Sequence, residues 1–320
     1  MKYLLFGVAF TSLLHSTIDT TQSTVPTNVV EQSTLPRYRD AAANDAFYLP
    51  SYEGLKPTKY APLAASLAIV PGLGHIYLGD YATAGSFLGS AAASYVFATQ
   101  SHNFVAVYSG IESMQTIMIY GIYAAYRDAR SFNGPANYHY PMPKDSISDL
   151  IYAPFEWKTI SKPEVWAGIF GTLAVGTALS TWAYGHIAPM SISLADVIPF
   201  TAFPIGIREE ALFRGFLQPA LSEIATPIGG WILSSLAFGA AHLSNAHNLP
   251  SEYRQTYYTV SIPYIAAFGA YAGWLAQKNR SLKECVAVHA WYDFTLFALE
   301  AAAMRATTNT PKHFSMAWTF

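Results

Sequence analysis

Two adjacent carboxylates mark the stretch that decides the fold, Arg208-Glu209-Glu210-Ala211-Leu212-Phe213-Arg214-Gly215-Phe216. An apolar run from Val197 to Ile207 precedes it, and the chain that follows is apolar for most of its length. A charge at the centre of a membrane helix costs roughly 2.5–3.5 kcal/mol on insertion scales, so adjacent carboxylates there need a function. Taken alone, the stretch fits equally well the first turn of an amphipathic helix at a water boundary. The rest of the chain has to decide between the two.

The composition indicates a membrane protein. Charged residues make up only 12% of the chain and apolar residues 52%, against about 25% and somewhat under 50% in soluble domains. Apolar runs of about 20 residues, the length that crosses a hydrocarbon core, recur along the chain. We therefore expect an all-α fold, a polytopic transmembrane bundle of about eight spans after an N-terminal signal sequence.

The net charge and the cysteine count limit the partners and the sites that this chain can have. The net charge of −2 argues against a nucleic-acid partner, because nucleic-acid binding calls for a basic patch. The single cysteine, Cys285, rules out an intramolecular disulfide and a cysteine-cluster metal site.

The N-terminal region is expected to lie outside the helical bundle. Met1-Lys2 precedes an apolar run from Tyr3 to Leu14, which is too short to span a membrane and suits a signal sequence. We assign residues 1–22 to a signal peptide, either cleaved or kept as an anchor. Residues 23–59 are rich in Ser, Thr, Pro and Asn and are assigned to an extended polar tail.

A three-helix membrane domain is predicted over residues 60–126, from apolar segments near 61–79, 82–100 and 104–125. Its stretch from Pro71 to Gly79, Pro-Gly-Leu-Gly-His-Ile-Tyr-Leu-Gly, resembles the Pro-Gly-x-Gly-Gln-x-Tyr-x-Gly signature of small bacterial membrane hairpin domains. That resemblance implies a structural role and a bacterial inner membrane as the location. His75 and Glu112 are either hydrogen-bonded packing residues or functional polar groups within the membrane.

Residues 127–163 form the main break in the apolar pattern. They are expected to be a cytoplasmic linker loop under the positive-inside rule, because they contain Arg127, Arg130, Lys144, Lys158 and Lys162. The second membrane domain is predicted over residues 164–305, with spans near 164–185, 194–221, 228–246, 257–277 and 282–304. Residues 306–320 are assigned to a polar tail.

The first polar group of the second domain is the opening stretch. Glu210 and Arg214 are four residues apart, so on a helix they can form an ion pair. Glu209 is rotated from Glu210 by about 100° and can face a different partner.

Two further polar groups lie in the spans that follow. His242 stands near the end of an apolar run, where a lone histidine is usually a core residue. His289 and Asp293 share one face of the last span and form either a buried hydrogen-bonded pair or a pair that shares a metal ion or a proton. Successive segments thus each place a carboxylate or an imidazole at membrane depth.

Together the groups read as Glu-Glu-x-x-x-Arg, Phe-x-x-x-His and His-x-x-x-Asp, at Glu209, Glu210 and Arg214, at Phe238 and His242, and at His289 and Asp293. In this order they resemble the motifs of the CAAX-protease and bacteriocin-processing family of intramembrane proteases, which includes the type II CAAX prenyl endopeptidases. The resemblance covers residues 160–305 and not the N-terminal half. It implies an endopeptidase embedded in the lipid bilayer, with a membrane-associated protein or peptide as its substrate.

The resemblance also implies roles for the motif residues. Glu209 would act with His242 to activate a water molecule as general base. Glu210, paired with Arg214, would organise the site. His289 and the residue four positions later would polarise the scissile carbonyl and stabilise its oxyanion.

Asp293 departs from the family pattern, which commonly has Asn at this position. An ionised Asp has no proton to donate to an oxyanion. Asp293 is therefore either held protonated, or it binds a divalent metal together with His242 and His289, for which zinc is the best match. Metal-assisted hydrolysis and metal-free glutamate catalysis both stay open.

Two functions from other classes are also compatible with this pattern. One is a non-catalytic membrane scaffold or immunity-type protein of the same fold. The other is a proton-coupled transporter, for which inverted repeats are expected. The chain shows no internal repeat.

Overall fold

The computed structural model describes residues 59–134, 137–184 and 198–306, which form helices and no strand. The all-α class is therefore confirmed over these residues. The expected signal peptide and nearly all of the two expected polar tails lie outside the described residues.

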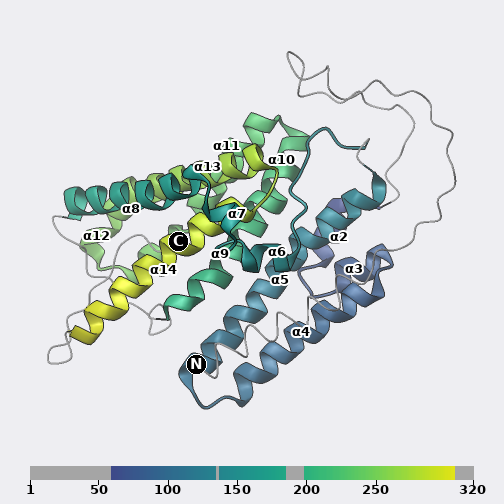
Figure 1. Cartoon of the computed structure of the whole chain (residues 1–320), viewed down its shortest axis with the longest axis horizontal. Coiled ribbons are helices and arrows are strands. Elements are labelled where there is room, and N and C mark those ends of the chain that lie inside the picture. The colour runs from purple at the N-terminus through teal and green to yellow at the C-terminus, as the bar shows by residue number, and fades with distance from the viewer. Residues whose placement is uncertain (1–58, 135–136, 185–197, 307–320) are drawn as a thin grey trace.

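Figure 1 labels the α-helices along the chain, and their bounds are α2 Ala61–Leu67, α3 Leu73–Leu78, α4 Tyr81–Gln100, α5 Phe104–Asn133, α6 Ile147–Tyr152, α7 Trp157–Ile160, α8 Pro163–Tyr184, α9 Ala202–Glu210, α10 Gln218–Ile224, α11 Pro227–Ala241, α12 Ser251–Thr256, α13 Ile262–Asn279 and α14 Lys283–Ala306. Short 3₁₀ segments lie at Pro199–Thr201 and Leu243–Asn248. Two π-helical segments continue α9 and α12, at Ala211–Leu217 and Tyr257–Ser261.

The apolar segment near 61–79 does not form a single helix. It breaks into α2 and α3, because Gly72 adopts a φ of +87° that side-chain-bearing residues rarely adopt. A Cβ built on Gly72 would lie 2.5 Å from the carbonyl oxygen of Ala84 in α4. The turn therefore lets α4 pack closely over the break.

Helix α5 continues past residue 126, where the linker was expected to begin, and ends at Asn133. The cationic residues that suggested a loop have partners within the fold: Arg127 Nε donates to Asp128 at 2.7 Å, and Arg130 Nη2 donates to Glu223 of α10 at 2.9 Å. Gly134 then ends the helix with a φ of +84°. The rest of the expected linker contains α6 and α7.

Helix α5 connects the N-terminal helices to the rest of the molecule. In Figure 1 the blue N-terminal helices group on one side, and α5 runs along the inner face of that group. It packs against α2 and α4 on one side and against α9 and the first π-helix on the other. Tyr126 meets Phe216 edge-on at 5.1 Å, and Gly215 lies directly against the ring of Tyr123.

The start of α14 is held by the chain segment that follows α5. Asp145 accepts a hydrogen bond from Ser281 Oγ at 2.8 Å and one from the backbone N–H of Leu282 at 2.7 Å. Its own carbonyl accepts one from Arg127 at 2.7 Å. A side chain from another segment thus satisfies the backbone N–H of the residue before α14, and Ser281 Oγ accepts from the N–H of Lys283, the first residue of the helix, at 3.1 Å.

Apolar side chains cover much of the outside of the later helices. Trp182 at the end of α8 is 76% exposed, and Phe170, Ile228 and Leu236 are exposed on α8 and α11. By length and composition, α8 is the one described helix that could cross a membrane. The eight spans expected from the sequence therefore remain a prediction.

Candidate active site

Glu209 and Glu210 are the last residues of α9, and the helix continues directly as the π-helical segment Ala211–Leu217. Single π-turns inside helices are rare and frequent at functional sites. Across this turn Arg214 Nη1 donates to Glu210 Oε1 at 3.0 Å, and both side chains are fully buried. The ion pair that the spacing predicts is thus present.

The second helix of the site, α11, covers Arg214. The guanidinium lies 4.2 Å from the ring centre of Phe238, a cation–π contact. Ser234 Oγ, one turn earlier on the same face, donates to the carbonyl of Phe213 at 2.8 Å. This bond ties α11 to the π-helix and satisfies a carbonyl there.

Helix α14 brings His289 to the same carboxylate. His289 Nδ1 lies 2.7 Å from Glu210 Oε1, so Glu210 joins Arg214 and His289. The close approach of α14 to α9 depends on Gly206 of α9, where a Cβ would lie 3.2 Å from the backbone nitrogen of Ala290. Glu210 is therefore an internal anchor that links α9, the π-helix and α14.

His242 caps the C-terminus of α11. Its Nδ1 lies 2.7 Å from the carbonyl oxygen of Phe238, so Nδ1 carries the proton that it donates. The other ring nitrogen, Nε2, faces Glu209 Oε2 at 3.9 Å. Tyr257 Oη donates to the backbone carbonyl of His242 at 3.1 Å and fixes this end of the helix.

Glu209 lies between the two histidines. Its Oε2 is 3.9 Å from Nε2 of His242 and also 3.9 Å from Nε2 of His289. These separations are too long for direct hydrogen bonds and are of the size that a bridging water spans. The Glu209 side chain is 17% exposed, whereas those of Glu210 and His289 are fully buried.

Asp293 completes the group on α14. Its Oδ2 lies 3.4 Å from His289 Nε2, and neither carboxylate oxygen has a hydrogen bond within the described structure. Asp293 brings the carboxylates of the site to three, the others being Glu209 and Glu210, against one permanently charged cation, Arg214. Protons on the imidazoles or acids, or a bound cation, must offset the excess negative charge.

A metal ion is not prearranged in this geometry. The described residues include no group of three or more His, Cys, Asp or Glu side chains placed to hold one. His242, His289 and Asp293, the predicted ligands, converge on the region of Glu209 without forming such a set. The structure thus brings all six predicted site residues into one neighbourhood, but not into a coordination sphere.

One contribution to the site was missed in the sequence. Ser234 lies four residues before Phe238 and eight before His242, so all three share a helix face. This spacing could have placed Ser234 on the site's side of α11, but its bond to the carbonyl of Phe213 on another helix has no signal in the sequence. Outside the site, Glu223 of α10 accepts bonds from Arg130 Nη2 and the backbone N–H of Tyr140, both at 2.9 Å.

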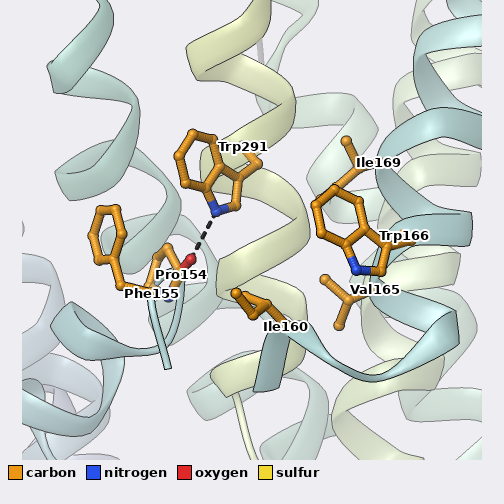
Figure 2. A pocket seen from close by; sticks show the side chains of 7 residues that line it. All are labelled: Pro154, Phe155, Ile160, Val165, Trp166, Ile169 and Trp291. Atoms are coloured by element: carbon orange, nitrogen blue, oxygen red, sulfur yellow. Dashed lines mark hydrogen bonds between the residues drawn. The ribbon is translucent and has the colours of Figure 1, made fainter. Parts of the chain in front are cut away.

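An apolar cavity of about 200 Å³ lies on another face of α14. Figure 2 shows Trp291 forming one wall and donating through Nε1 to the carbonyl oxygen of Pro154 at 2.8 Å. The remaining lining residues are Phe155, Ile160, Val165, Trp166 and Ile169. None of the acidic or imidazole residues of the site lines this cavity.

Residues 191–295 match the family model described as type II CAAX prenyl endopeptidase Rce1-like. The match contains every motif residue from Glu209 to Asp293, stops short of the N-terminal half, and confirms the resemblance to the CAAX-protease family. It supports a CAAX-type intramembrane protease in general. No curated protein and no solved structure matches the chain.

Proposed function

We propose that the protein is an intramembrane endopeptidase that hydrolyses a peptide bond in a membrane-associated protein or peptide. The observation that carries the proposal is the gap between Glu209 Oε2 and His242 Nε2. With the ring proton of His242 on Nδ1, both atoms can accept a hydrogen bond, and they face each other at 3.9 Å. A water molecule that donates one proton to each would fill this gap and be held for attack.

In the proposed reaction Glu209 is the general base. It takes one proton from the water while the water oxygen forms a bond to the scissile carbonyl carbon. When the tetrahedral intermediate collapses, the C–N bond breaks and Glu209 returns the proton to the leaving amine. The products are a carboxylic acid and an amine, which become a carboxylate and an ammonium group when the acid's proton passes to the amine, and Glu209 is regenerated.

His289 is proposed to stabilise the oxyanion. Its Nδ1 is engaged by Glu210, so Nε2 is the nitrogen that faces the region of Glu209. A proton on Nε2 is available for the developing negative charge, where preorganised donors are most effective. Glu210 and Arg214 hold this ring in place and do not react.

Two alternative roles are proposed for Asp293, one without a metal and one with a metal. In the metal-free form, a protonated Asp293 donates a hydrogen bond beside His289. In the other form His242, His289 and Asp293 would hold a divalent ion, for which zinc is the best match, and the ion would supply Lewis-acid activation of water. We keep the metal-free form as the working proposal, because Glu209 and His242 can hold a water molecule without any movement of their side chains.

The proposed location is a bacterial inner membrane, crossed by about eight spans. The apolar side chains on the outside of α8 and α11 support contact with lipid, since soluble proteins rarely expose large contiguous apolar areas. The N-terminal helices would lie in the same bilayer, with residues 127–163 on the cytoplasmic side.

The central experiment is a cleavage assay on the full chain in phosphatidylethanolamine–phosphatidylglycerol liposomes. The probe is a library of internally quenched peptides with apolar flanks, and products are sequenced by mass spectrometry in ¹⁸O-water. Glu209→Gln and His242→Ala should each lower turnover by about 10²–10⁴-fold. The new carboxylate should carry one ¹⁸O atom.

Glu164→Gln is the matched control, because Glu164 pairs with Lys278 at the surface, away from the site. Full activity in either site variant would refute the assigned roles. Cleavage of no library member by the wild-type chain would favour the non-catalytic scaffold.

Metal dependence is tested on the same preparation. Dialysis against a chelator followed by zinc addition should leave turnover unchanged if the metal-free form is correct. Loss of turnover on chelation and its return with zinc would establish the metal-assisted form instead.

A further inference from the structure

A buried ion pair connects the N-terminal helices to the residue next to Glu209. Arg208 Nη1 donates to Oε2 of Glu112, which lies in the N-terminal third of α5. The Glu112 side chain is 5% exposed and that of Arg208 is 15% exposed. Glu112 lies outside the residues that match the protease family model.

A second polar contact lies one turn away on both helices. Thr116 Oγ1 donates to the carbonyl oxygen of Pro204 at 3.1 Å. Glu112 contacts Arg208, and Thr116, four residues later on α5, contacts Pro204, four residues earlier on α9. The two helices are therefore antiparallel and joined at two points on facing stripes.

These contacts define the rotation of α9 about its own axis. Successive residues of an α-helix are rotated by about 100°, so a helix that turns Arg208 toward α5 turns Glu209 toward a different side. That side holds His242 and His289, each 3.9 Å from Glu209 Oε2. No side-chain cap fixes the start of α9, and its end passes into the π-helix without a break.

We propose that Glu112 is a positioning residue for catalysis, which acts through Arg208 to hold Glu209 in line with His242. The N-terminal helices α2 to α5 are then a working part of the site and not only an additional membrane domain. This inference rests on the proposed function, because it assigns Glu112 its effect on the turnover of that site.

A stability measurement alone cannot test this proposal, because breaking any buried ion pair is destabilising. The chain offers a matched control in Arg130 and Glu223, which also join α5 to the later half, at 2.9 Å. That pair contacts α10 and the segment around Tyr140, not α9. Glu223→Gln therefore removes the same kind of interaction without touching Arg208.

The kinetic test compares Glu112→Gln, Arg208→Gln, the double variant and Glu223→Gln in liposomes with the peptide library. Each single variant at the Glu112–Arg208 pair should lower kcat about tenfold with little change in KM, since misplacing a reacting group lowers turnover. The double variant should also lose about tenfold and not about a hundredfold, because the two residues act as one unit. Glu223→Gln should keep the wild-type kcat.

A second measurement does not depend on activity. Hydrogen exchange of the amides of residues 202–214 should be faster in Glu112→Gln than in the wild type and unchanged in Glu223→Gln. Wild-type exchange in Glu112→Gln, or effects of the two single variants on kcat that multiply, would overturn the proposal. Failure of the proposed function would show differently, as full turnover in Glu209→Gln.

Discussion

Glu209 Oε2 and His242 Nε2 face each other at 3.9 Å, although α9 and α11 are separated along the chain by the π-helix and α10. The proton on His242 Nδ1 is committed to the carbonyl of Phe238. In the proposed mechanism a water molecule bridges Glu209 Oε2 and His242 Nε2, and the position of that water depends on the length of the Glu209 side chain.

We predict that Glu209→Asp lowers kcat about 100-fold without a matching loss of stability. The shorter side chain keeps the carboxylate but withdraws it from His242, and a misplacement of about 1 Å can cost this much. The measurement is kcat in liposomes beside the thermal midpoint of unfolding, with Glu164→Asp as the control. A wild-type kcat in Glu209→Asp would show that the carboxylate does not position the attacking water.

Removing the cation of the buried pair should destabilise the protein severely. In Arg214→Met the carboxylate of Glu210 keeps its burial and loses its permanent countercharge, which costs about 3–5 kcal/mol. The double variant Glu210→Gln with Arg214→Met should recover part of this loss, because no buried charge is then left alone. Unfolding in mixed micelles measures both free energies, and equal losses in the single and double variants would contradict the prediction.

The parts of this site that lie on one helix could be predicted from sequence. Spacing alone places Glu210 beside Arg214 and His289 beside Asp293, since residues four apart are neighbours on a helix. The contact between His289 and Glu210 at 2.7 Å could not be predicted in the same way. It depends on how closely α9 and α14 approach, and no local pattern encodes that distance.

Two features of the fold could not be predicted from the sequence either, because no local pattern encodes contacts between segments. Arg127 and Arg130 predict a cytoplasmic loop when they are counted as charges, but each has a partner within the fold and α5 continues through them. The π-helix after Glu210 is invisible because Ala211–Leu217 has ordinary helical composition. The bond from Ser234 to Phe213 that accompanies it comes from a different helix.

Gly215 is required where the protease motif meets the N-terminal helices. A Cβ at this position would lie 2.5 Å from Cδ2 of Tyr123, which is fully buried in α5 and cannot move aside freely. We predict that Gly215→Ala lowers the free energy of unfolding by about 1–3 kcal/mol. Gly171→Ala is the control, because a Cβ there meets nothing within 4 Å. Equal stability of the two variants would refute this packing argument.

Asp145 should stabilise the start of α14. It accepts bonds from Ser281 and from the Leu282 N–H, and loss of a helix cap of this kind costs about 1–2 kcal/mol. We predict a loss of this size in Asp145→Ala and a smaller one in Asp145→Asn, which keeps one acceptor oxygen. Unfolding free energies in mixed micelles test the order. An Asp145→Ala variant as stable as the wild type would show that the cap is not needed.

Glu156, at the start of α7, should make stability depend on acid pH. The hydrogen bond from Lys283 lowers the pKa of Glu156, with burial opposing it in part. Because the folded pKa lies below the unfolded value of about 4.3, the stabilisation is fully present above that pH and is lost as the pH falls through the folded pKa. The thermal midpoint of the wild type should thus fall between about pH 6 and about pH 3, and that of Glu156→Gln should fall less. Glu252→Gln serves as the control and should follow the wild type. Within the described part of the chain, the Glu252 carboxylate accepts a hydrogen bond from the neighbouring Ser251 hydroxyl at 3.3 Å. Identical pH profiles for Glu156→Gln and the wild type would show that Lys283 does not stabilise the ionised form of Glu156.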